Sequence, residues 1–152
     1  MKVGDIAQNF IFKDETGKDF ELYKNLYTQM LLVFYPKDDT PVCSFQLAEY
    51  SNNLEEYIKN GIKVVGINAG TVQSHSDFCT KLDIKFPLLA DEDKKISRQY
   101  DAINFMGITK RLLVVIGTDR KVLWTASTLP LKFVKTKEIV EKVKYLNSKE
   151  MT

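Results

Sequence analysis

The sequence predicts an α/β fold in which a mixed central sheet carries helices on both faces. Residues 30–35 form a continuous apolar run, which is typical of a central strand covered on both sides, and residues 63–68 predict a second buried strand. Segments with helical periodicity lie between the predicted strands, so strands and helices alternate through most of the chain. A hairpin and a helix come last. Alternation that ends in a hairpin and a helix favours a mixed sheet over a purely parallel one.

The first half of the chain predicts a hairpin, a turn, the central strand and a long helix. Phe10 and Phe12 alternate ahead of a turn at Gly17, which is the pattern of a β-hairpin. The long helix ends at Gly61, a residue type favoured just beyond a helix C-terminus. The predicted elements are a hairpin at 9–13 and 19–22, a turn or short helix at 22–28, a strand at 30–35 and a helix at 40–60.

The second half predicts three further strand–helix steps. Its elements are a strand at 63–68, a helix at 71–82, a strand at 86–90, a helix at 92–100, a hairpin of 112–116 with 122–125, and a helix at 136–146. The full order is that of a thioredoxin-like fold with an N-terminal β-hairpin and an inserted strand and helix. We therefore expect one domain over residues 1–152.

Composition excludes several functional classes. An apolar fraction of 44% and a charged fraction of 28% are ordinary for a globular protein. A net charge of +2, spread among acids, favours neither nucleic acid nor an acidic membrane as a partner. No stretch approaches the roughly 18 apolar residues that span a bilayer, and the N-terminus lacks the layout of a signal peptide. A cytoplasmic location follows as an expectation, and the two cysteines are then reduced core thiols or a transient redox pair.

Cys43 is the first candidate for chemistry. Thr40 and Pro41 predict a helix N-cap followed by proline at the first helical position, which places Cys43 in the first turn. Unpaired backbone N–H groups and the helix dipole stabilise a thiolate there, and the thiolate is the nucleophilic form of cysteine. The alternative is an inert core residue, because Cys43 also opens an apolar stripe along the helix. That stripe continues through Leu47, Tyr50, Leu54, Tyr57 and Ile58.

A wider pattern around Cys43 resembles the active-site signature of the peroxiredoxins. Pro36, Thr40 and Cys43 form P-x-x-x-T-x-x-C at the end of a buried strand, and the flanking residues 34–46 resemble the bacterioferritin-comigratory (PrxQ) branch. Residues 74–91 resemble the PrxQ segment S-H-x-x-F/W…L-x-F-P-L-L-S/A-D. The resemblance implies a thioredoxin-like fold and a thiol-dependent peroxidase in which Cys43 attacks a peroxide and becomes a sulfenic acid.

The resemblance also implies roles for three residues near Cys43. Pro36 matches the proline that shields the thiolate, although it is also a plain strand terminator. Thr40 would place its hydroxyl beside the thiolate, with simple helix capping as the alternative. Arg111 matches the arginine at the start of a strand, where a guanidinium suits both thiolate stabilisation and peroxide orientation. Lys110 is adjacent, and only one of the pair faces the site because side chains alternate along a strand.

Cys79 resembles the resolving cysteine that some PrxQ proteins hold in this helix; the position used by others is Ala48 here. An intramolecular Cys43–Cys79 disulfide would form and be reduced by a thioredoxin-like or related disulfide reductase. Both cysteines lie on apolar helix faces, so local unfolding is expected because a disulfide needs Cα atoms within about 7 Å. The alternative is a core Cys79 and a one-cysteine peroxidase resolved by an external thiol.

His75 is the single histidine, and its possible roles are limited. A cysteine–histidine hydrolase or a metal site would need partners that the sequence does not supply at known spacings, so a structural histidine is expected.

Gln46 is expected to act at most indirectly, by contacting other residues of the site and not the substrate. Neither metal nor organic cofactor is implied. The expected partners are a peroxide and a disulfide reductase, and the protein is expected to be a monomer or small homodimer. The competing class is a thioredoxin-fold binding or redox-sensing module without turnover.

Overall fold

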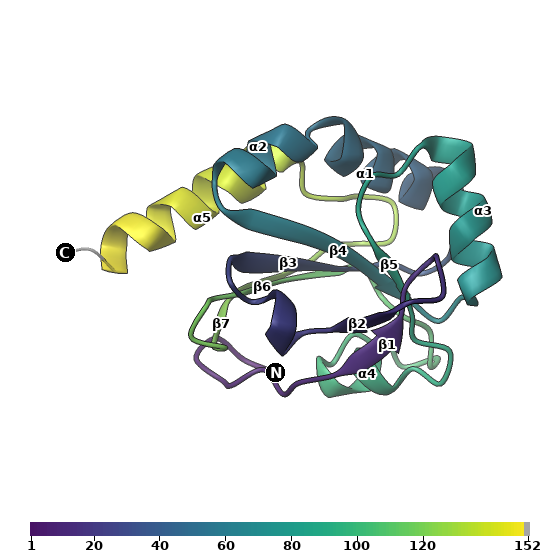
Figure 1. The fold of residues 1–152 in the computed structure, drawn as a ribbon, viewed down its shortest axis with the longest axis horizontal. Coiled ribbons are helices and arrows are strands. Elements are labelled where there is room, and N and C mark those ends of the chain that lie inside the picture. The colour runs from purple at the N-terminus through teal and green to yellow at the C-terminus, as the bar shows by residue number, and fades with distance from the viewer. Residues whose placement is uncertain (151–152) are drawn as a thin grey trace.

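The computed structural model describes residues 1–150 and contains a five-stranded sheet in the order β5-β4-β3-β6-β7. Two shorter strands, β1 and β2, form a separate antiparallel hairpin near the N-terminus (Figure 1). The strands are β1 (Ile11–Lys13), β2 (Asp19–Glu21), β3 (Gln29–Phe34), β4 (Ile62–Asn68), β5 (Leu88–Ala90), β6 (Leu112–Ile116) and β7 (Val122–Ser127).

The main sheet is mixed because two kinds of pairing meet at β3. β4 runs parallel to β3 and to β5, whereas β6 runs antiparallel to β3 and to β7. β3 is covered on both faces, as its unbroken apolar run predicts. Its side chains alternate between two cores, with Met30, Leu32 and Phe34 in one and Leu31, Val33 and Tyr35 in the other.

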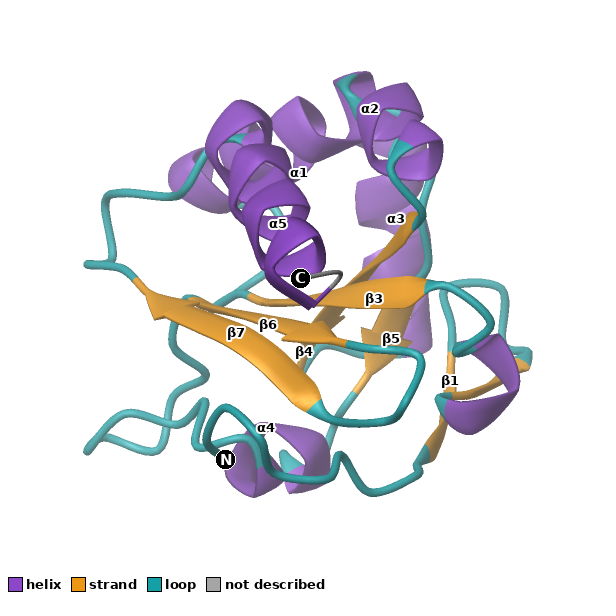
Figure 2. Cartoon of the chain, turned by 90° about the vertical axis from the view of Figure 1, so that its left-hand side faces the viewer, coloured by secondary structure: helices purple, strands orange, loops and turns teal. Residues whose placement is uncertain are grey.

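The two cores place helices on opposite faces of the sheet (Figure 2). Four helices pack on one face, and the fourth helix in the chain packs on the other together with the N-terminal hairpin. The helices are α1 (Pro41–Asn52), α2 (Leu54–Lys59), α3 (Val72–Leu82), α4 (Lys95–Gln99) and α5 (Thr136–Glu150), with a short 3₁₀ helix at Tyr23–Asn25. The predicted class, a mixed sheet with helices on both faces and an N-terminal β-hairpin, is confirmed.

The long helix predicted over residues 40–60 is wrong in one respect, since it is two helices that meet at Asn53. The Asn53 amide side chain donates to the Glu49 carbonyl, a local bond that competes with helix continuation. The break shifts the helical phase, so Tyr57 stays buried while Ile58, expected on the same stripe, is 65% exposed.

The fourth helix is also shorter than predicted, beginning at Lys95 rather than at residue 92. The buried carboxylate of Asp91 accepts from the backbone N–H groups of Ile96 and Ser97, at 3.0 and 2.8 Å. A carboxylate in this position satisfies N–H groups that have no partner inside the helix. The residues between Asp91 and Lys95 form the turn that brings the carboxylate there.

Strand register brings the two ends of the predicted active site together. Phe34, the last residue of β3, pairs with Leu112, the first residue of β6. The next residue before β6 is Arg111, and the next after β3 is Tyr35, so these two emerge at the same edge of the sheet. The loop at 36–40 and the start of α1 follow immediately. None of the described helices combines the length and apolar character needed to cross a membrane.

Leu32→Ala tests the central position of β3. Leu32 is fully buried, and we expect the substitution to lower the free energy of unfolding by about 2–5 kcal/mol through lost burial and a residual cavity. The matched control is Leu131→Ala, because Leu131 is 81% exposed; a change within about 0.5 kcal/mol is expected there. Urea unfolding of the three proteins measures both, and equal effects would contradict the burial described.

Candidate active site

Cys43 lies in the first turn of α1, where Thr40 is the N-cap and Pro41 occupies the first helical position, as predicted. The Cys43 side chain is 1% exposed and packs in the core that includes Leu47 and Tyr50. The backbone N–H groups of a first helical turn have no partner within the helix. Cys43 is thus a buried residue on the apolar face of α1 and also lies in the first turn of that helix. Both features that the sequence predicts for this position are present.

Arg111 supplies the positive charge that faces Cys43. Both terminal nitrogens of its guanidinium, Nη1 and Nη2, lie 3.6 Å from the Cys43 sulfur. Arg111 is 3% exposed, while the neighbouring Lys110 is half-buried and its backbone N–H donates to the Ala102 carbonyl. The structure therefore turns Arg111, and not Lys110, toward the cysteine.

The guanidinium is held in place by neutral acceptors. Nη1 donates to the Gln46 side-chain oxygen at 2.5 Å, and Nη2 donates to the Pro130 carbonyl at 3.0 Å. Neither acceptor is charged, and the Arg111 Nε is buried without a partner among the described residues. Arg111 is thus a buried cation with no bonded carboxylate, and the Cys43 sulfur lies directly in front of it.

Gln46 is itself fixed by Tyr50, one turn further along α1. The Gln46 amide donates to the Tyr50 hydroxyl at 3.1 Å, and that hydroxyl donates to the Val134 carbonyl at 2.6 Å. Burial raises the pKa of Tyr50 above its usual value, so the phenol keeps its proton and remains a donor. This chain connects α1 to the segment between β7 and α5, which also supplies the Pro130 carbonyl.

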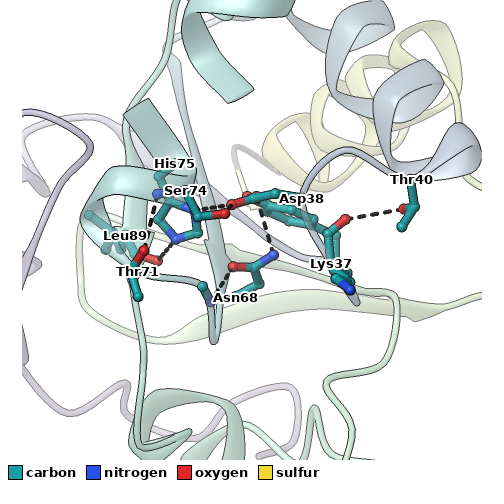
Figure 3. Close-up of polar contacts among 10 residues, drawn as sticks. Lys37, Asp38, Thr40, Asn68, Thr71, Ser74, His75 and Leu89 are labelled. Carbon is teal, nitrogen blue, oxygen red and sulfur yellow. Dashed lines mark hydrogen bonds and ion pairs between the residues drawn. The ribbon is translucent and has the colours of Figure 1, made fainter. Parts of the chain in front are cut away.

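Thr40 differs from the expectation in one detail. Its side chain makes no capping hydrogen bond, and its hydroxyl instead donates to the Lys37 carbonyl at 3.1 Å (Figure 3). The loop reverses at Asp39, whose φ of 59° lies in the left-handed region, and this turn brings the Lys37 carbonyl within reach of the hydroxyl. The oxygen lone pairs of Thr40 are left free to accept. Pro36, half-buried, begins the same loop.

Cys79 lies on α3, is half-buried and is a free thiol, as is Cys43. Partial burial raises the pKa of the Cys79 thiol to about 12, and the carboxylates of Glu15, Asp38 and Asp14 contribute to the increase. Cys79 is therefore a protonated thiol at neutral pH. The two cysteines have opposite electrostatic surroundings, because a cation faces Cys43 and carboxylates surround Cys79.

His75 is fully buried and both of its ring nitrogens have partners. Nδ1 lies 2.6 Å from the Asp38 carboxylate and Nε2 lies 3.0 Å from the Leu89 carbonyl. Removing one member of such a buried pair costs about 3–5 kcal/mol. No group of three or more His, Cys, Asp or Glu side chains in the described part of the chain is arranged to hold a metal ion.

Sequence reasoning missed three contributors to the site. The apolar stripe accounts for Tyr50 only as a core residue, although a tyrosine one turn after Gln46 could have indicated a shared hydrogen bond. Pro130 acts through its carbonyl, and a backbone acceptor leaves no signal in residue identity. The sequence places Asp38 only in a loop, yet it is 8% exposed and bonds to groups distant in sequence.

Comparisons with known proteins identify the family of this chain. A model of the "AhpC/TSA family" matches residues 3–125. "Peroxiredoxin Bcp" of Escherichia coli strain K12 is 33% identical over 129 residues, covering 80% of this chain and 83% of the relative. "Putative peroxiredoxin bcp" of Helicobacter pylori strain J99 is 35% identical over 102 residues, 67% of each chain. The crystal structure of "Peroxidoxin BcpB" from Mycobacterium tuberculosis has a TM-score of 0.84 at 27% identity over 97% of both chains.

The thioredoxin-like fold and these relatives define a thiol-dependent peroxidase, an oxidoreductase that works through cysteine. The chain belongs to the AhpC/TSA family and to its bacterioferritin-comigratory, or peroxiredoxin Q, branch. Peroxiredoxins act on peroxides and are reduced by thioredoxin-like proteins. The predicted family and class of activity are confirmed, and the alternative of a binding module without turnover is set aside.

The surroundings of Cys79 predict slow alkylation in the folded protein. In a Cys43→Ser variant, we expect iodoacetamide to label Cys79 at pH 8 at least about tenfold more slowly than in urea, because only the thiolate reacts. The folded rate should keep rising with pH toward the pKa of about 12, whereas the unfolded thiol, with an ordinary pKa of 9.0, levels off earlier. Equal rates in buffer and urea at pH 8 would contradict the raised pKa.

Proposed function

We propose that Cys43 is the nucleophile that reduces hydrogen peroxide and organic hydroperoxides. The thiolate sulfur attacks one peroxide oxygen, an S–O bond forms and the O–O bond breaks. The other oxygen leaves as hydroxide or alkoxide and takes up a proton from the solvent to give water or an alcohol, and Cys43 becomes a sulfenic acid. The observation that carries this proposal is the approach of both terminal guanidinium nitrogens of Arg111 to within 3.6 Å of the buried sulfur.

Arg111, Thr40 and the first-turn N–H groups of α1 are the proposed donors and acceptors around the peroxide. The guanidinium is already oriented by Gln46 and Pro130, so it need not reorganise as charge develops on the leaving oxygen. The Thr40 hydroxyl donates to Lys37 and keeps lone pairs that can accept from a peroxide O–H. Pro36 is proposed to limit the access of water to the sulfur from the loop side.

Cys79 is the proposed resolving cysteine. Its sulfur attacks the sulfenic sulfur of Cys43, an S–S bond forms, the S–O bond breaks and water leaves. A thioredoxin-like or related disulfide reductase then restores both thiols by exchange. Because the pKa of Cys79 is about 12 in the folded protein, we propose that α1 and α3 loosen locally before this step, which exposes the thiol to water.

A second candidate is a one-cysteine peroxidase in which an external thiol reduces the sulfenic acid. The observation that favours it is again the surroundings of Cys79, since a half-buried thiol flanked by carboxylates is a poor nucleophile. In that case Cys79→Ser leaves turnover with a small thiol reductant unchanged.

Several properties of the whole chain belong to the proposal. Residues 1–152 form one domain, supported by two cores that share β3. The protein is a monomer or small homodimer and has neither nucleic-acid nor membrane partners, consistent with a net charge of +2. A cytoplasmic location is supported by the use of only two cysteines.

One equivalent of hydrogen peroxide, followed by peptide mapping by mass, tests the assignment of both cysteines. We expect an intramolecular Cys43–Cys79 disulfide and the loss of two hydrogens. A sulfenic acid on Cys43 with Cys79 still free would support the one-cysteine enzyme instead. Unmodified Cys43 would overturn its assignment as the nucleophile.

Arg111→Lys tests the two guanidinium nitrogens that face the Cys43 sulfur. A lysine carries the same charge but cannot donate two parallel N–H groups, so we expect the rate constant for oxidation of Cys43 to fall about a hundredfold. The matched control is the neighbour, Lys110→Ala, which is expected to stay within about twofold because Lys110 faces away. Stopped-flow measurement with excess peroxide gives both rates, and equal losses would contradict the orientation described.

A further inference from the structure

The Asp38 carboxylate is a buried acceptor that joins three parts of the chain (Figure 3). It accepts from the Tyr35 hydroxyl at 2.6 Å, from the Asn68 amide at 3.3 Å and from the Ser74 hydroxyl at 2.7 Å. A fourth donor, His75 Nδ1, lies 2.6 Å away. The donors come from the end of β3, the end of β4 and the first turns of α3. We call this group the Asp38 cluster.

His75 and Asp38 form the centre of the cluster. The Leu89 carbonyl can only accept, so the Nε2 that faces it at 3.0 Å carries a hydrogen. The Asp38 carboxylate faces Nδ1, and hydrogen bonds from His75, Tyr35 and Ser74 outweigh burial and lower the pKa of Asp38, which keeps it ionised. Each ring nitrogen of His75 thus faces an oxygen within hydrogen-bond distance, and the His75 and Asp38 side chains are 0% and 5% exposed.

Close packing keeps the Asp38–His75 pair away from water. A Cβ at Gly70 would lie 3.0 Å from the Asp38 carboxylate, 3.0 Å from the His75 ring and 3.0 Å from the Asn68 side chain. There is therefore no room for a side chain over the cluster at this point. Polar interactions are stronger in such surroundings because nearby water does not screen them.

The cluster joins the two segments of the chain that carry the cysteines. Asp38 is in the loop that leads into α1 and Cys43, and His75 is one helical turn before Cys79 on α3. Burial, the Asp38 carboxylate and both cysteines raise the pKa of Tyr35, whose hydroxyl donates to Asp38. The same four contacts fix the position of the Cys43 loop and of the helix that carries Cys79.

We infer that the Asp38–His75 pair is a latch that positions Cys43 against Arg111 while closed and must open before Cys79 can reach Cys43. This inference rests on the proposed roles of the two cysteines. Asp38 and His75 touch neither sulfur and are positioning residues. A closed latch favours oxidation of Cys43, and an open latch favours the disulfide, so weakening the pair has opposite effects on the two steps.

Three variants test the latch. The amide nitrogen of a glutamine reaches about as far as Nε2 of the ring, so His75→Gln keeps a donor near the Leu89 carbonyl and loses the donor to Asp38. The amide of an asparagine reaches about as far as Nδ1, so His75→Asn keeps a neutral donor to Asp38. The control is Lys81→Ala, which removes an exposed 2.7 Å contact to Asp39 that joins the same loop to the same helix. Lys81 and Asp39 are 62% and 60% exposed, so screening makes this contact weak.

Quenched-flow mass spectrometry with dimedone trapping measures the two steps separately. For His75→Gln we expect sulfenic acid formation to slow roughly tenfold and disulfide formation to speed up roughly tenfold, the scale of one charge-assisted hydrogen bond. Excess peroxide should then leave less Cys43 as sulfinic acid than in the unchanged protein. His75→Asn should restore most of the first rate, and Lys81→Ala should change neither.

Slowing of both steps together, or a change in neither, would overturn the latch, because the latch requires the two rates to change in opposite directions. Ser74→Ala removes one donor and serves as a milder variant should His75→Gln fail to fold. The unchanged protein separates this inference from the proposed function. If it forms the disulfide and the variants behave like it, the latch alone is wrong. If it forms a sulfenic acid but no disulfide, the role of Cys79 is wrong and the latch fails with it.

Discussion

A guanidinium buried in the core must find acceptors, and that requirement organises the active site. Arg111 obtains two neutral oxygens, from Gln46 and the Pro130 carbonyl, and then faces the Cys43 sulfur with both terminal nitrogens. No carboxylate is among these partners, so the Cys43 sulfur is the side chain toward which the charge is left free to act. The position of the arginine in turn depends on the pairing of Phe34 with Leu112, which brings two distant parts of the chain to one sheet edge.

Most of the fold could be predicted because its signals are local and strong. The unbroken apolar run of β3, the Thr40–Pro41 helix start and the Gly61 stop each act through residues close in sequence, and all three lie where expected. The break at Asn53 was missed because a single side-chain bond to the Glu49 carbonyl competes with a helix that the pattern alone would continue.

The site was less predictable than the fold, for a physical reason. Cys43, Pro36 and Thr40 lie in one short segment with a recognisable motif, and Arg111 follows from its position before a strand. The remaining partners act across long sequence separations or through the backbone. Asp38 acquires its importance from donors on β4 and α3, and Pro130 contributes a carbonyl that any residue could supply. Such contacts exist only after the chain has folded and have no local pattern.

The antiparallel pairing of β3 with β6 has a consequence for how the protein becomes active as it is made. Cys43 and Arg111 are separated by 68 residues, and the pair forms only when β6 has joined the sheet. Pairings between distant segments come late in folding because a long loop must close first. A chain still emerging from the ribosome therefore holds Cys43 without the cation that faces it in the finished fold. The proposed activation of Cys43 by Arg111 therefore coincides with completion of the fold and is absent from an unfinished chain.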